Sequence, residues 1–145
     1  MSPPHVLLAE RPAGCESFFS LDSPDRASAR SLVFEDDGDS GYVYACVTNG
    51  HGPGSARIVE SKLVYVVDRD VERDSLVNVA LVWDEDGARA GVCVGERLAA
   101  AFDFDGAAAW SRTAFPPCSD GWNELPVHVC DEVERWFASV RGSTT

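Results

Sequence analysis

Apolar residues stand at every second position in several stretches of the chain, and this alternation limits the possible folds more than any other feature. The clearest case runs from Leu76 to Trp83, where Val77, Val79, Leu81 and Trp83 share one face of an extended backbone. The turn formers of residues 84–87 follow, and residues 88–94 return with a second apolar run. This pattern predicts an antiparallel hairpin with one face directed into a core.

Other segments repeat the signal of a strand followed by a turn. An acidic turn joins residues 31–35 to 42–47, and the favoured hairpin turn Asp105-Gly106 joins residues 98–104 to 107–113. Residues 57–67 form one long predicted strand, with Val59, Ser61, Leu63, Tyr65 and Val67 on one face. Short apolar runs at residues 6–8 and 18–21 are weaker strand candidates. The sequence predicts a mostly antiparallel sheet of about seven to eight strands in hairpins or a meander.

The end of the chain has helical rather than strand spacing. From Pro126 to Arg141, one face carries Val129, Val133, Trp136 and Val140. Proline suits the first turn of a helix, and Arg141 followed by Gly142 suits the last. We therefore expect an α+β fold in which one C-terminal helix covers a face of the sheet.

Length and composition indicate one soluble domain. The chain has 145 residues, enough for a single core, and we take 1–145 as one domain with loose ends at 1–4 and 142–145. The first residues lack the features of a signal peptide, and no apolar run approaches the ~20 residues that span a bilayer. The five cysteines form no C-x-x-C pair, which favours a reducing compartment. We expect a cytoplasmic protein.

The charge of the chain restricts its partners. Acidic residues number 24 against 12 basic ones, the formal net charge is −12, and Lys62 is the only lysine. Such a charge repels nucleic-acid phosphates and anionic lipids and attracts basic proteins. We therefore expect no nucleic-acid or membrane partner and consider a basic protein partner.

Two blocks of the sequence resemble a known family of small bacterial proteins. The first block comprises Phe34-Glu35-Asp36-Asp37-Gly38, Gly41-Tyr42 and Tyr44-Ala45, and the second comprises Phe102-Asp103-Phe104, Arg112 and Phe115-Pro116-Pro117. They are similar to motifs of the family catalogued as domain of unknown function 2251, over roughly residues 17–122. The resemblance implies a bacterial origin and a single domain, and it carries no catalytic residues with it.

Metal, cofactor and nucleophile signals are weak. Asp36, Asp37 and Asp39 lack the offsets of a calcium-binding loop. Cys118, His128 and Cys130 fail as zinc ligands, because residues two apart on a helix point in different directions. Cys118 with His128 is conceivable as a nucleophile and base, but no nucleophile motif such as G-x-S-x-G is present. We expect no metal and no cofactor, and the sequence leans away from an enzyme.

The first functional hypothesis is a non-catalytic acidic module that binds a basic protein, as an immunity protein or antitoxin does. The net charge and the acidic tips at residues 35–39, 68–74 and 84–86 motivate it, and Trp110 with Arg112 would provide a buried anchor. The predicted contact residues are Glu35, Asp36, Asp37, Asp39, Tyr42, Trp110 and Arg112.

The alternative is a small-ligand binder or enzyme with a pocket near Glu35, Asp103, Arg112 and Phe115. A partly buried Glu35 would have a raised pKa and could act as an acid or base. Glu35 or Asp36 could instead cap the tight turn through backbone N–H groups. The sequence leaves the oligomeric state open.

Overall fold

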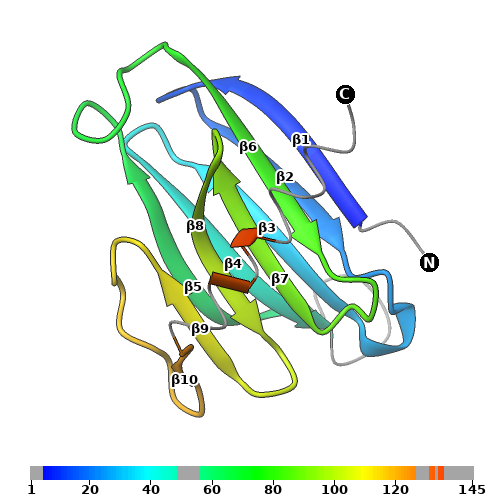
Figure 1. The fold of residues 1–145 in the computed structure, drawn as a ribbon. Coiled ribbons are helices and arrows are strands. Elements are labelled where there is room, and N and C mark those ends of the chain that lie inside the picture. Colours follow the sequence, from blue (N-terminus) through cyan, green and yellow to red (C-terminus); the bar gives the residue numbers. More distant parts are fainter. Residues whose placement is uncertain (1–4, 49–55, 127–130, 133, 136–145) are drawn as a thin grey trace.

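The computed structural model of the protein describes residues 5–48, 56–126, 131–132 and 134–135. In these residues the chain forms two β-sheets that lie face to face as a sandwich (Figure 1). One sheet has the order β1-β6-β7-β8-β9-β10, and its strands are β1 (His5–Pro12), β6 (Leu76–Trp83), β7 (Arg89–Val94), β8 (Arg97–Asp103), β9 (Ala108–Ser111) and β10 (Asn123–Glu124). The other has the order β2-β3-β4-β5, with β2 (Ser17–Asp22), β3 (Arg30–Asp36), β4 (Ser40–Thr48) and β5 (Ala56–Val66).

The strands pair much as the alternation predicts. The hairpins β3–β4, β6–β7 and β8–β9 are antiparallel, which confirms the hairpin predictions. Strands β9 and β10 pair in parallel, and a short 3-10 helix, η1 (Arg26–Ser28), precedes β3.

The predicted α+β class is wrong. The described residues are 59% strand and 6% helical, and no helix among them covers a sheet. Within the predicted helix, four described residues have helical backbone: Asp131, Glu132, Glu134 and Arg135. Three of these four are exposed. Residues 127–130, residue 133 and the residues after 135 lie outside the described residues. The apolar faces of the two sheets instead cover each other, so the fold is a β-sandwich.

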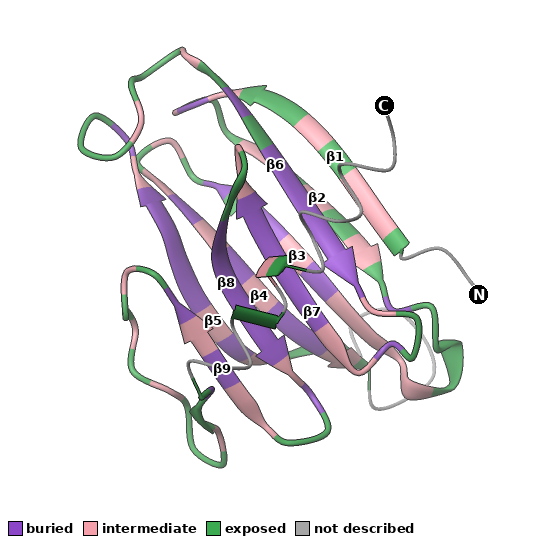
Figure 2. Ribbon diagram, in the orientation of Figure 1, coloured by how far each residue is buried: buried purple, intermediate pink, exposed green. Residues whose placement is uncertain are grey.

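The core lies between the sheets. Its large and almost fully buried members come from the middle strands: Leu32, Phe34, Val43, Val79, Leu81, Trp83, Val92 and Phe102. Figure 2 shows this burial concentrated in β6, β7 and β8 of the front sheet. The predicted inward face of β6 is thereby confirmed. Each such side chain contributes about 1.5–3 kcal/mol through burial, and the Trp83 indole N–H also donates to the Leu21 carbonyl at 2.9 Å, which links the two sheets.

The six-stranded sheet is apolar on its other face too. Ala80 and Val82 alternate with the core residues of β6 and form a second buried cluster with Cys93, Leu98, Ala101 and Leu125. Near-continuous apolar strands are the signature of a sheet that is buried on both faces.

Residues 113–119, here called the edge segment, close one side of the sandwich. They leave the six-stranded sheet after β9 and lie along β5, the edge strand of the other sheet. The Leu63 N–H donates to the Phe115 carbonyl at 2.8 Å, and the Thr113 hydroxyl donates to the Leu63 carbonyl at 2.9 Å. The edge segment thus pairs backbone groups that an edge strand would otherwise leave open.

Candidate functional site

The outer face of the four-stranded sheet gathers aromatic and acidic side chains. In β3 and β4, Phe34 and Val43 point into the core, so their neighbours Glu35, Tyr42 and Tyr44 point outward. The strand register places Phe18, Glu35, Tyr42 and Leu63 in one row across all four strands, with Tyr44 in the next row. We call Phe18, Glu35, Tyr42 and Tyr44 the aromatic–acidic face.

Internal contacts hold this face in one arrangement. The Tyr44 hydroxyl donates to Glu35 Oε1 at 2.9 Å, and the Tyr42 and Tyr44 rings stack with centroids 6.3 Å apart. Partial burial and then the hydrogen bond to Glu35 raise the pKa of Tyr44 to about 12. Tyr44 therefore remains a hydrogen-bond donor at neutral pH. Phe18 is 68% exposed, so its ring is open to a partner.

The acidic hairpin tip separates into buried and exposed acids. Asp36 is 2% exposed and accepts hydrogen bonds from the Gly14 N–H, the Gly38 N–H and the Tyr65 hydroxyl. Asp36 therefore caps the turn through backbone N–H groups, which is one of the two roles predicted from the sequence, and its carboxylate is directed inward. Asp37 is exposed, and backbone N–H groups of residues 39 and 40 hold its pKa below the usual value.

Asp39 is exposed at the same tip. Arg73 lies 3.8 Å from its carboxylate and donates to the Gly38 carbonyl at 2.9 Å. The same arginine pairs with Asp68 at 3.1 Å, so it ties the tip to the segment after β5.

Trp110 and Arg112 lie elsewhere. Trp110 is on β9 and packs on the second cluster, on the face of its sheet that points away from β2–β5. The Arg112 guanidinium lies 5.6 Å from the Trp110 ring and donates twice to the Leu98 carbonyl. The structure therefore separates this pair from Glu35 and Tyr42.

The residues of the alternative pocket are also spread over different elements. Glu35 lies on the aromatic–acidic face, beside a depression that it shares with Phe18 and Asp37. Asp103 ends β8, where it accepts from the Gly106 N–H at 3.1 Å and lies 3.7 Å from Arg89. Phe115, half exposed, belongs to the edge segment. Arg112 borders another cavity, so the structure does not bring Glu35 and Arg112 to one site.

A buried polar cluster at the edge segment was missed by sequence reasoning. Lys62 and Glu60 of β5 are each 1% exposed. The Lys62 ammonium donates to the Pro116 carbonyl at 2.7 Å and lies 3.7 Å from Cys118 Sγ. Glu60 accepts from the backbone N–H and the hydroxyl of Ser119. The available signal was that both charged residues share one face of a strand whose other positions are largely apolar.

The chemistry of this cluster favours a structural role. Burial raises the pKa of the Cys118 thiol, nearby Lys62 lowers it, and the carboxylates of Glu124 and Glu60 raise it again, with a net increase. A thiol with a raised pKa carries little thiolate at neutral pH and is a poor nucleophile. His128, its predicted base, lies outside the described residues.

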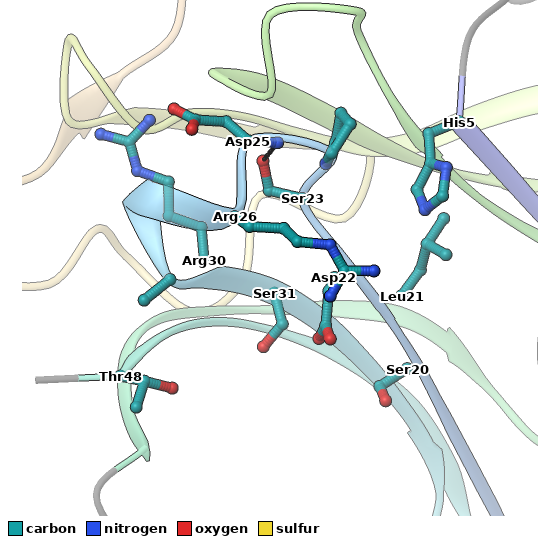
Figure 3. A pocket seen from close by; sticks show the side chains of 12 residues that line it. His5, Ser20, Leu21, Asp22, Ser23, Asp25, Arg26, Arg30, Ser31 and Thr48 are labelled. Atoms are coloured by element: carbon teal, nitrogen blue, oxygen red, sulfur yellow. Dashed lines mark hydrogen bonds between the residues drawn. The ribbon is translucent and has the colours of Figure 1, made fainter. Parts of the chain in front are cut away.

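A polar cavity of about 460 Å³ lies where β2, η1 and the end of β4 meet (Figure 3). Asp22 and Asp25 line it together with Arg26 and Arg30, and Figure 3 shows Arg26 extending toward Asp22. Arg30 is also paired with Asp105 at 2.8 Å. Mixed charges of this kind do not select a ligand of one sign.

The described residues contain neither a cluster of metal ligands nor a membrane-spanning helix. No group of three or more His, Cys, Asp or Glu side chains within them is arranged to hold a metal ion. None of their helices is long and apolar enough to cross a membrane.

Comparison with known proteins gives one family match. A family model described as an uncharacterized protein conserved in bacteria, DUF2251, matches residues 13–138. No curated protein and no solved structure matches the chain significantly. The matched region covers most of the chain and includes both motif blocks, so the predicted family is confirmed. The chain belongs to the DUF2251 family of bacterial proteins.

Proposed function

We propose that this protein is a non-catalytic binding module that holds a basic protein on its aromatic–acidic face. The observation that carries the proposal is the cross-strand row of Phe18, Glu35 and Tyr42, with Tyr44 bonded to Glu35. A rigid sheet presents these side chains, and aromatic residues are the commonest anchors of protein interfaces.

The shape and charge beside the row support a basic occupant. A depression of about 450 Å³ adjoins Phe18, and the exposed acids Glu16, Glu35 and Asp37 line it. A lysine or arginine side chain of a partner would meet carboxylates there and aromatic rings next to them. Both are favourable surroundings for a cation.

The overall charge supports the same partner class. A net charge of −12 creates a long-range field that speeds association with basic proteins and discourages acidic ones. Within this class we favour an immunity-like inhibitor, which binds a basic toxin and blocks it.

Position-specific photo-crosslinking in the bacterium that encodes the chain tests the proposal. The photoreactive residue p-benzoylphenylalanine replaces Phe18 in one strain and Leu8 in a control strain. The two positions match because both side chains are 68% exposed, but Leu8 lies on β1 of the other sheet. Mass spectrometry then identifies the crosslinked proteins.

The proposal predicts that one basic protein crosslinks at position 18 and not at position 8. When that protein is purified with its activity, adding the DUF2251 protein should lower the activity. Equal crosslinking at both positions, or an acidic partner at position 18, contradicts the proposed face. A basic partner whose activity is unchanged supports binding and contradicts inhibition.

A further inference from the structure

A second cavity has a charge opposite to that of the whole protein. It has a volume of about 590 Å³ and lies between the end of β5 and the turn from β7 to β8. Arg69, Arg97 and Arg112 line it, and Asp70 is the one acidic residue among its described lining residues. In a chain with twice as many acids as bases, this cavity carries an excess of two positive charges.

The excess charge of the cavity comes from Arg97 and Arg112, because Arg69 is paired with Asp70. Arg112 donates its Nε and one Nη to the Leu98 carbonyl, which fixes its guanidinium without neutralising it. A guanidinium has five N–H donors, so Arg112 retains donors for a ligand. The carboxylate of Asp70 is already engaged by the Val66 N–H at 2.8 Å and by Arg69 at 3.3–3.4 Å.

The rest of the cavity wall is partly apolar. Val64 is a core residue, and Val71 and Val94 pack against the core from the cavity side. Small-molecule sites are concave, have volumes of roughly 300–1,000 Å³, and combine apolar walls with a few polar groups. This cavity fits that description.

We infer that the cavity binds a small organic anion, whose carboxylate or phosphate lies against the arginines and whose apolar body lies on the valines. Arginine suits such a ligand because its planar fork meets carboxylate and phosphate groups with two hydrogen bonds. The site is separate from the aromatic–acidic face, because it is built from β5, β8 and the segments next to them.

Isothermal titration calorimetry with four probes tests the inference. Octanoate and octyl phosphate carry the two head groups on the same apolar body, octylamine reverses the charge, and inorganic phosphate lacks the apolar body. We expect octanoate or octyl phosphate to bind about tenfold or more tightly than octylamine and inorganic phosphate, and the stronger of the two identifies the head group.

Variants locate the binding. Arg69→Gln combined with Arg97→Gln should weaken binding of the better probe by about tenfold or more. Arg57→Gln is the control, since Arg57 is an exposed arginine at the other end of β5. Arg112 is left intact because it anchors the Leu98 carbonyl.

Four results would overturn the inference. Octylamine could bind as tightly as octyl phosphate, which would show that the positive charge of the cavity does not select the ligand. Inorganic phosphate could bind as tightly as octyl phosphate, which would show that the apolar body contributes nothing to binding. Binding could also be unchanged in the double variant, or lost equally in Arg57→Gln, which would place the anion elsewhere. Amide chemical shifts near Val71 and Val94 report on the site independently of affinity.

Discussion

Tyr65 donates its hydroxyl proton to the buried carboxylate of Asp36 through a hydrogen bond of 2.6 Å. The bond joins β5 to the hairpin tip of β3 and β4, and the Gly14 and Gly38 N–H groups complete the carboxylate's partners. The orientation of the tip, and hence of Glu35 beside it, depends on this inward-facing acid.

Removing that hydroxyl should destabilise the protein. Tyr65→Phe keeps the ring against Phe34 and leaves a buried carboxylate oxygen with one partner fewer, which costs about 1.5–3 kcal/mol. Urea unfolding measures the loss, and Tyr42→Phe, on the outer face, is the control. Equal stability of the two variants would show that the bond contributes little.

Stability should also fall at alkaline pH. Burial and then the hydrogen bond to Asp36 raise the pKa of Tyr65 above its usual value of 10.0, and the pKa of Tyr44 rises to about 12. Above pH 10 the unfolded chain releases these protons while the folded protein retains them, so rising pH favours unfolding. The slope is at most about 1.4 kcal/mol per pH unit for each group.

Unfolding free energies at about pH 8 and at about pH 11 measure this slope. The slope should be smaller in Tyr65→Phe, which lacks one of the titrating groups. An identical slope in the wild type and the variant would show that Tyr65 does not titrate abnormally.

Gly41 should tolerate no side chain. A Cβ at this position would lie 2.8 Å from the Tyr65 ring and 3.0 Å from the Phe34 ring, both in the core. Gly41→Ala should therefore cost about 1–3 kcal/mol through overpacking. Gly95→Asn is a useful comparison, because no atom outside its chain neighbours lies within 4 Å of its Cβ position and asparagine tolerates the positive φ of 62°. If Gly41→Ala unfolds at the same urea concentration as the wild type, the core is looser than described.

Lys62 should stabilise the edge segment. Lys62→Met keeps the length of the side chain and removes the hydrogen bond to the Pro116 carbonyl, which should cost about 1–3 kcal/mol. The Leu63 amide, bonded to Phe115 in the same segment, should then exchange its hydrogen faster. Arg57→Met, an exposed change on the same strand, should alter neither quantity. If the Leu63 amide exchanges at the same rate in Lys62→Met and in the wild type, Lys62 does not stabilise the edge segment.

The strands could be predicted because their signal is local. Alternation along residues 76–83 identifies both the strand and its inward face. The hairpin after β8 was predicted, but its connection spans residues 104–107 and the residue with positive φ is Ala107, not Asp105 or Gly106. How the strands divide into two sheets depends on contacts between residues far apart in sequence. The α+β prediction failed at this step, because it assumed a single sheet, which needs a helix to cover its apolar face.

The faces of β5 show a second limit. Alternation predicts that Leu63 and Tyr65 share a face, but Leu63 pairs with outward-facing Tyr42 while Tyr65 pairs with Gly41 and points into the core. The register shifts at this point of the β4–β5 pair, and such a bulge reverses the faces beyond it. No feature of the sequence marks the bulge, and the interior position of Glu60 and Lys62 was missed on the same strand.

The candidate site was predicted in part. Glu35 and Tyr42 were selected from the acidic hairpin and do lie in one row, whereas Asp36 turns inward because it follows Glu35 by one position on a strand. Tyr44 and Phe18 were not selected, because their place beside Glu35 depends on pairing across β2, β3 and β4. Trp110 and Arg112 were predicted on the same surface, but Trp110 lies on the other sheet and Arg112 directly follows its strand β9.

The affinity of the protein crosslinked at position 18 for charge-reversed variants tests the central claim most directly. Glu35→Lys and Glu85→Lys change the net charge equally, but Glu85 is an exposed residue of the turn between β6 and β7. The aromatic–acidic face predicts that Glu35→Lys weakens binding by about tenfold or more while Glu85→Lys changes it little. Equal effects of the two variants would show that only overall charge attracts the partner, and would contradict the assignment of this face.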